Sequence, residues 1–170
     1  MALPAKLKHM NLFNDGSSYV GQVEEITLPT LTRVMEDYRG GGMNAPIGTD
    51  QGMEALTMEW TCGGLMDEPL RQFGITQHDG VLLIFNGSYT AEDGSGIKAV
   101  EIEMRGRHSA IDMGTAKAAE GGTLKINSNL SYYRLNINGE NIIEIDIINM
   151  IEIIDGVDRL KEHRTALGLS

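Results

Sequence analysis

The sequence predicts a mainly β, antiparallel domain, and three observations carry this prediction. Apolar and polar residues alternate along several segments, such as residues 56–60 and 100–104, which gives each strand one apolar and one polar face. Glycine-rich turn signals separate these segments, and Asn138-Gly139 is typical of a two-residue hairpin loop. Glycine is frequent, at 21 residues, while there are only 4 prolines, a balance that favours tight turns over disordered linkers.

The strands follow one another between turn signals. Asp15-Gly16 predicts a turn after the first strand, and Gly94-Ser95-Gly96 predicts another before the strand at 97–104. Residues 124–132 place apolar side chains on even positions, whereas residues 133–137 place them on odd positions. A β-bulge produces such a slip, and so does a strand buried on both faces. The pattern leaves both explanations open.

Two short helices are expected at the periphery of the sheets. The first begins after an Asp67 cap and has Pro69 in its first turn, Leu70 and Phe73 facing inward, and Gly74 as its stop. The second covers 158–167, and Gly168 ends it. Both are too short to be stable alone and must pack against the rest of the domain.

Two long stretches interrupt the strand pattern. Residues 39–52 contain five of the glycines, and residues 109–122 are similar in composition. Loops of this length inside a compact β domain are usually functional or mobile, and Met43, Met53 and Met113 suit an adaptable contact surface. No composition shift divides the chain, so we expect a single domain over residues 1–170.

Charge and cysteine content exclude several function classes. The formal net charge is −10, which argues against static binding to nucleic acid and against binding to an anionic membrane surface. Cys62 is the only cysteine, so the chain has no internal disulfide and no four-thiolate zinc site. We expect Cys62 to be a small buried or half-buried side chain. Residues 1–13 contain no apolar segment typical of a signal peptide.

No cluster in the sequence predicts catalysis or a cofactor. His78 and His108 are interpreted as solvated turn residues, because the histidines have no metal-ligand spacing. Two carboxylate pairs share a strand face, as a glycosidase requires, although a solvated sheet surface is the usual interpretation of such pairs: they are Glu101 with Glu103, and Glu144 with Asp146. We therefore expect no catalytic residue, no metal and no cofactor, and a structural or interaction role.

Acidic residues are concentrated near the C-terminus. Residues 140–158 contain six acids and no lysine or arginine, whereas the expected helix after them carries Arg159, Lys161 and Arg164. Solubility explains this pattern. Charge complementarity between copies of the chain explains it more specifically, and an anionic wall past which a polyanion slides is a third interpretation.

Several segments, in order and at matching spacing, resemble one protein family. They are Leu28-Pro29 with Leu31-Thr32-Arg33, residues 38–46, residues 56–60, Gly87-Ser88-Tyr89, residues 104–107 with Ile111-Asp112, residues 132–135, residues 144–151, residues 156–160 and residues 167–169. Together they resemble, over nearly the whole chain, the major tail tube proteins of contractile-tailed bacteriophages. R-type bacteriocin tube proteins are similar.

The resemblance implies a β-sandwich or barrel-like protomer with a flanking helix. It also implies hexameric rings that stack into a tube inside a contractile sheath, through which DNA leaves the capsid. The implied partners are further copies of the chain and the tail sheath, tape measure, baseplate hub and tail terminator proteins, with DNA only in transit and no membrane binding. The implied location is the phage tail of the virion, after assembly in the host cytoplasm.

The resemblance also suggests roles for particular residues. The long Gly-rich loop is expected to contact the adjacent ring through Arg39, Gly40, Gly41, Gly42, Met43, Asn44 and Met53. The strand acids Glu101, Glu103, Glu144 and Asp146 are candidates for the lumen or for contacts between subunits. The alternative function is a glycan-binding or glycan-active acidic β domain, which predicts a monomer or small oligomer.

Overall fold

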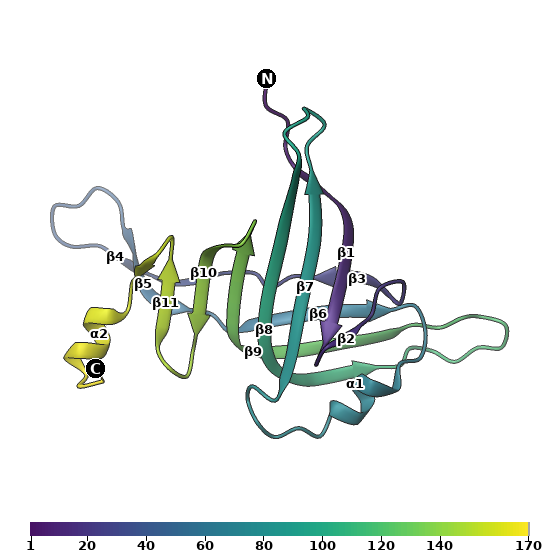
Figure 1. Cartoon of the computed structure of the whole chain (residues 1–170). Helices are drawn as coiled ribbons and strands as arrows, with labels where there is room; N and C mark the ends of the chain where they lie inside the picture. The colour runs from purple at the N-terminus through teal and green to yellow at the C-terminus, as the bar shows by residue number, and fades with distance from the viewer. Residues whose placement is uncertain (170) are drawn as a thin grey trace.

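The computed structural model of the chain describes residues 1–169 and has antiparallel strands in two layers, with two short helices at the periphery (Figure 1). The mainly β, antiparallel prediction is therefore confirmed, although the described strands form no closed barrel. The elements are β1 (Lys6–Asn14), β2 (Ser17–Ser18), β3 (Val23–Thr27), β4 (Arg33–Tyr38), β5 (Ile47–Met53), β6 (Leu56–Cys62), α1 (Asp67–Gln72), β7 (Val81–Thr90), β8 (Ile97–Asp112), β9 (Leu124–Ile137), β10 (Glu140–Asp146), β11 (Ile151–Ile154), β12 (Val157–Asp158) and α2 (Lys161–Ala166).

Two long strands belong to both layers. The main path of the sheet runs β12-β11-β10-β9-β8-β7-β1-β2, and β3 and β6 attach to it through β9. The first half of β9, residues 124–130, lies between β6 and β8. Its second half, residues 132–137, lies between β10 and β8. The two layers are therefore continuous through β8 and β9, which cross from one to the other (Figure 1).

A β-bulge marks the point where β9 changes layer. Arg105 pairs with Tyr132 and Gly106 with Leu130, so Ser131 is left outside the ladder. The predicted change from even to odd apolar positions in residues 124–137 is therefore caused by a β-bulge, since the buried side chains change from even to odd positions across Ser131. Gly106 permits the close approach of the strands, since a Cβ there would lie 2.0 Å from the carbonyl oxygen of Asn129.

The core lies between the layers and follows the predicted alternation. Met58 and Trp60 of β6, Phe85 of β7 and Met104 of β8 are almost completely buried. Each large apolar side chain removed from water in this way contributes about 1.5–3 kcal/mol to the free energy of unfolding. The predicted Asn138-Gly139 hairpin is confirmed, because both residues have positive φ (51° and 80°) between β9 and β10.

The helices are shorter than the sequence predicts. Met66, without a side-chain hydrogen bond, stands at the N-cap position of α1, so Asp67 does not cap this helix. Phe73 follows the last residue of α1 and is 53% exposed, not inward, and Gln72 is buried instead. The second helix covers only Lys161–Ala166 of the expected 158–167, because residues before it pair as β12. No described helix is long and apolar enough to cross a membrane.

Both predicted loops contain strand residues. Residues 47–52 belong to β5, so the connection after β4 is limited to residues 39–46. Residues 109–112 belong to β8, and the second loop covers residues 113–123. Pairing with a partner strand overrides the weak local propensity in both places.

A buried polar network joins α1 to the sheets. The Nε2 of Gln72 donates to Oδ1 of Asn14 at 2.8 Å, and the Nδ2 of Asn14 donates back to Oε1 of Gln72 at 2.8 Å. The same Oε1 lies 3.0 Å from Nε2 of His108, whose Nδ1 lies 2.8 Å from the hydroxyl of Ser128. These partners favour neutral His108 with its proton on Nε2. The prediction that His108 is a solvated turn residue is wrong, because it is 5% exposed on β8.

Burial of His108 makes the stability of the fold depend on pH. Burial lowers the pKa of His108 from 6.5 to about 4, and nearby Asp15 opposes this shift. Below pH 6.5 the histidine is protonated in the unfolded chain, whereas in the folded chain it stays neutral until about pH 4. We expect the free energy of unfolding to fall by up to roughly 3 kcal/mol because of His108 as the pH falls from 6.5 to about 4.

Urea unfolding of the wild type and of His108→Gln between pH 7 and pH 4 measures this effect. We expect the stability of His108→Gln to fall less over this range, because glutamine does not titrate. An identical decrease in both proteins would contradict the assignment to His108.

Candidate functional site

A two-stranded hairpin, here called the arm, projects beyond the main sheet. It consists of β4, the tip (residues 39–46) and β5, which pair only with each other from Arg33↔Met53 to Tyr38↔Ile47. Figure 1 shows the arm extending past β10 and β11, on the side of the molecule where α2 lies. An isolated two-stranded ribbon is marginally stable in water, so contacts at its base or with another molecule must support it.

Arg33 fastens the base of the arm to the main sheet. Its guanidinium lies between two carboxylates: Nε is 3.3 Å from Oδ2 of Asp50 on β5, and the second ion pair is with Glu152 on β11. The Glu152 side chain is only 6% exposed, and Arg33 is its ion-pair partner. Met53 packs against the core at the same place. The direction of the arm therefore depends on one buried carboxylate and its cation.

The tip of the arm closes on itself through the Gly-rich sequence. Gly40 N donates to Sδ of Met43 at 3.0 Å, and Nε of Arg39 donates to the Met43 carbonyl at 3.2 Å. Gly42 has a φ of +86°, which favours glycine. Met43 is half-buried in the tip, whereas Met53 lies at the base of the arm, so the two predicted contact methionines are not neighbours on one surface.

The most exposed apolar side chains of the arm are ones that sequence reasoning did not select. Met35, Tyr38 and Ile47 are 57%, 58% and 54% exposed, and Val34 is 40% exposed. Exposed apolar residues of this size, grouped on one projecting element, indicate an interaction surface. The absence of alternation in residues 33–38 is a signal in the sequence that points to them, because a strand of the core alternates.

The structure brings the four candidate acids to one face of the main sheet. Glu101 and Glu103 alternate with the buried Ile102 and Met104 on β8, so they face away from the core. Glu144 and Asp146 flank the buried Ile145 on β10 and share that face. Because Arg134 on β9 pairs with both Glu103 and Glu144, the three strands form one continuous polar surface, here called the acidic face.

Arginines and hydrogen bonds occupy part of the acidic face. Glu103 forms ion pairs with Arg134 and, at 3.3 Å, with Arg105. The Tyr132 hydroxyl donates to Oε1 of Glu144 at 3.0 Å. The pKa of Tyr132 is raised to about 12, mainly by burial and to a smaller extent by this hydrogen bond.

Asp146 accepts hydrogen bonds from the backbone and side chain of Asn149, at 3.1 and 2.7 Å. With four acids and two arginines, the face carries less negative charge than the sequence suggests.

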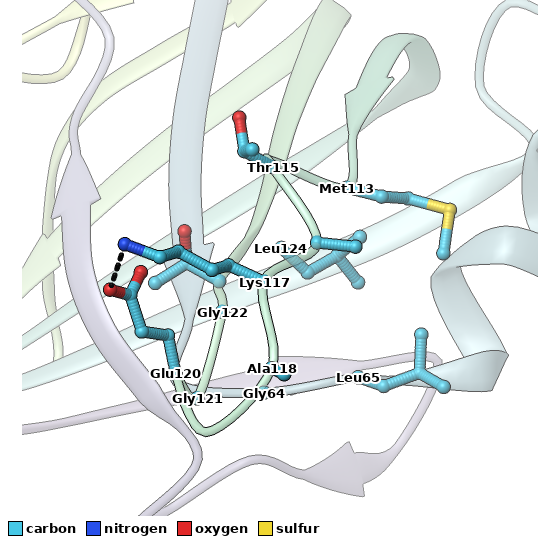
Figure 2. Close-up of a pocket in the computed structure, with 12 residues that line it drawn as sticks. Gly64, Leu65, Met113, Thr115, Lys117, Ala118, Glu120, Gly121, Gly122 and Leu124 are labelled. Atoms are coloured by element: carbon cyan, nitrogen blue, oxygen red, sulfur yellow. Dashed lines mark ion pairs between the residues drawn. The ribbon is translucent and has the colours of Figure 1, made fainter.

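The second loop forms a shallow pocket with the segment after β6. The pocket has a volume of about 400 Å³ and is lined by Gly64 and Leu65 and by most of residues 113–124. Figure 2 shows Lys117 directed toward Glu120 on this loop. The Lys117 Nζ lies 3.2 Å from Glu120, and both side chains are largely exposed. Small residues dominate this pocket.

The remaining reactive groups are separated. The prediction that Cys62 is buried is confirmed, and burial, with a smaller effect of Glu24, raises the pKa of its thiol to about 11. Nδ1 of the exposed His78 lies 3.0 Å from the Ser131 hydroxyl at the bulge. Among residues 1–169, no three His, Cys, Asp or Glu side chains form a group that could hold a metal ion.

Removal of the Arg33 cation tests how the arm is held. We expect Arg33→Gln to destabilise the fold by about 2 kcal/mol and to speed amide hydrogen exchange in β4 and β5, because Glu152 loses its cation while it stays buried. The control is Arg71→Gln, which breaks an exposed i,i+4 pair with Asp67 and should change stability by less than about 0.5 kcal/mol. Unchanged exchange in the arm of Arg33→Gln would show that other contacts hold it.

Comparison with known proteins places this arrangement in one family. Residues 4–168 match the family described as phage tail tube protein FII. The chain is 46% identical over 172 residues to the tail tube protein of Escherichia phage P2, covering 99% of this chain and 100% of the relative. It is 34% identical to the major tail tube protein of Serratia phage KSP20, with 99% of each chain covered.

A solved structure shares the fold. It is a chain of the sheath-tube complex of an extracellular contractile injection system, the PVC particle, in the extended state, with a TM-score of 0.58 and 8% identity, covering 78% of this chain and 91% of that one. The resemblance found in the sequence is thereby confirmed, and the chain belongs to the phage tail tube protein FII family.

Proposed function

We propose that copies of this chain assemble into hexameric rings that stack into the inner tube of a contractile tail, the conduit through which DNA enters the host. The observation that carries the proposal is the 46% identity, over the full length of both chains, to a phage tail tube protein. The role is structural, with no catalytic step and no cofactor. The chain is then a component of the virion, assembled in the cytoplasm of the bacterial host.

Unpaired strand edges support self-association. β1 pairs with β7 along its length, but on its other side it pairs with β2 only at Phe13 and Asn14, and the Leu12 carbonyl accepts from the Tyr19 N–H, which leaves the backbone of residues 6–11 open. Among the described strands, β3 pairs only with β6. Open edges present unpaired N–H and C=O groups, and pairing between neighbouring copies around a ring satisfies them.

The proposed contact between rings is the arm. Its tip contains Arg39, Gly40, Gly41, Gly42, Met43 and Asn44, and Met53 anchors its base against the core. The arm extends beyond the main sheet, and its Met35, Tyr38 and Ile47 are more than half exposed. Contact with an adjacent ring removes this apolar surface from water.

Shortening the tip tests this contact without cutting β5. The variant replaces residues 39–46 by Asn-Gly, a two-residue turn that suits the Tyr38↔Ile47 pair. We expect a folded monomer with a thermal midpoint close to that of the wild type and no tubes in negative-stain electron microscopy. Full-length tubes from this variant would refute the proposed role of the tip. A wild-type chain that stays monomeric at every concentration would refute the tube itself.

The proposed lumen wall is the acidic face. Glu101, Glu103, Glu144 and Asp146 lie there with Arg105 and Arg134, and the surplus of carboxylates repels DNA phosphates at short range. The repulsion is moderate in this arrangement because Glu103 is already paired. Such a wall keeps DNA from adhering while it passes.

DNA retention by purified tubes at low salt measures this property. We expect wild-type tubes to release DNA and Glu101→Lys/Glu144→Lys tubes to retain it, with a retention that falls as salt rises. The matched control, Asp67→Lys/Glu120→Lys, makes the same charge change at exposed positions outside the acidic face. Tight retention by the wild type, or equal retention by both variants, would count against the acidic face as the lumen.

The proposed partners are those of a tail tube. They are the tail sheath around the tube, the tape measure protein during assembly, and the baseplate hub and tail terminator at the two ends. The solved chain that shares this fold belongs to a sheath-tube complex, which supports a sheath partner for the present chain. DNA is a partner only in transit, and we propose no membrane binding by this chain.

A further inference from the structure

A groove lies between the base of the arm and the C-terminal segment. It has a volume of about 630 Å³ and is lined on one side by Arg33 and residues 50–53 of the arm, and on the other by residues 145–152, Arg159, Leu160 and His163. Its apolar lining includes Ile147, which is 49% exposed. A groove of this size accommodates two large side chains.

Some charged residues of the groove have a partner within the chain, and others form no ion pair there. Its three acids have partners: Asp50 and Glu152 pair with Arg33, and Asp146 binds Asn149. Arg159, by contrast, is exposed and forms no ion pair within residues 1–169, and the next residue but one, Lys161, is also exposed and unpaired there. Arg159 is therefore the arginine of the groove that has no carboxylate partner within residues 1–169, while Asp146 keeps its charge because its partner Asn149 is neutral.

The arm presents a matching surface. Tyr38 pairs with Ile47 and Glu36 with Thr49, so these four side chains share one face of the ribbon, while Met35 lies over Gly48 on the other face. Tyr38 and Ile47 are more than half exposed, and Glu36 forms no ion pair within the described residues. The face combines two apolar side chains with one unpaired carboxylate.

The arm does not reach the groove of its own chain. β4 and β5 stay paired from their tip to Arg33 and Met53, and Arg33 and Met53 themselves line the groove. A ribbon cannot fold its tip back onto its own base without breaking this ladder. A second copy of the chain is the occupant that carries the complementary surface.

We propose that the groove receives the arm of a neighbouring copy, with Tyr38 and Ile47 against the apolar lining and Glu36 beside Arg159. This inference rests on the proposed tube, and it names the surface on which the arm lies. The contact is head-to-tail, because each chain offers both an arm and a groove. It continues from subunit to subunit, so it suits rings or stacked rings and not a closed pair.

Charge reversal on each side, alone and together, tests the proposal. Wild type, Glu36→Arg, Arg159→Glu and the double variant are compared by sedimentation velocity and negative-stain electron microscopy over a range of protein and salt concentrations. Each single variant should raise the concentration needed for assembly roughly tenfold or more, because like charges then meet at the contact. The double variant should return to within about threefold of the wild type, since the pair is restored in reverse.

Matched controls separate this contact from a general effect of charge. Asp67→Arg and Arg71→Glu make the same changes in an exposed ion pair on α1 and should assemble as the wild type does. Thermal melts check that all variants are folded, and both target residues are exposed, so we expect no loss of stability.

The outcomes distinguish the inference from the proposed function. Wild-type tubes together with single variants that assemble normally, or with a double variant no better than the worse single variant, would overturn the docking of arm and groove but leave the tube intact. A wild type without any assembly would overturn both.

Discussion

The close approach of β8 and β9 at Gly106 is the constraint on which the rest of the fold depends. A side chain there would meet the Asn129 carbonyl, so the two backbones come together only because glycine occupies this position. Beside it, Ser131 leaves the ladder and β9 turns from one layer to the other. Two strands thus connect both layers, and the buried side chains of β6, β7 and β8 meet between them without a separate linker.

This construction separates a well-packed body from a weakly supported arm. The body buries Trp60, Phe85 and Met104, whereas β4 has no buried residue and depends on its partner strand and on the Arg33–Glu152 ion pair. The Arg33–Glu152 pair fixes the orientation of the arm more than it adds to the free energy of unfolding, because desolvation of the two charges offsets most of their attraction. In the proposed tube, contact with a neighbouring copy would cover the exposed apolar side chains of the arm and add the support that its own chain does not provide.

The structure shows which acidic residues are paired with arginines, and the net charge of the sequence does not show this. The net charge of −10 suggests a strongly anionic surface, and the alternation of Glu101 and Glu103 with apolar residues correctly predicts that these acids share one face. Which acids are neutralised depends on cross-strand neighbours, and Arg134 reaches Glu103 from a strand 31 residues further along the chain. Arg159 forms no ion pair within residues 1–169, because Asp50 and Glu152 of the same groove pair with Arg33 instead.

The sequence by itself determined the strand alternation, the Asn138-Gly139 hairpin, the burial of Cys62 and the family, because these depend on residues close together in the chain or on a full-length pattern. Only the tertiary structure decided that His108 is buried and that residues 47–53 form a strand. His108 is buried because Gln72 of α1 and Ser128 of β9 lie against it, and residues 47–53 are extended because they pair with β4. Periodicity describes which face of a strand is apolar, but it carries no information about the strand or helix that covers that face.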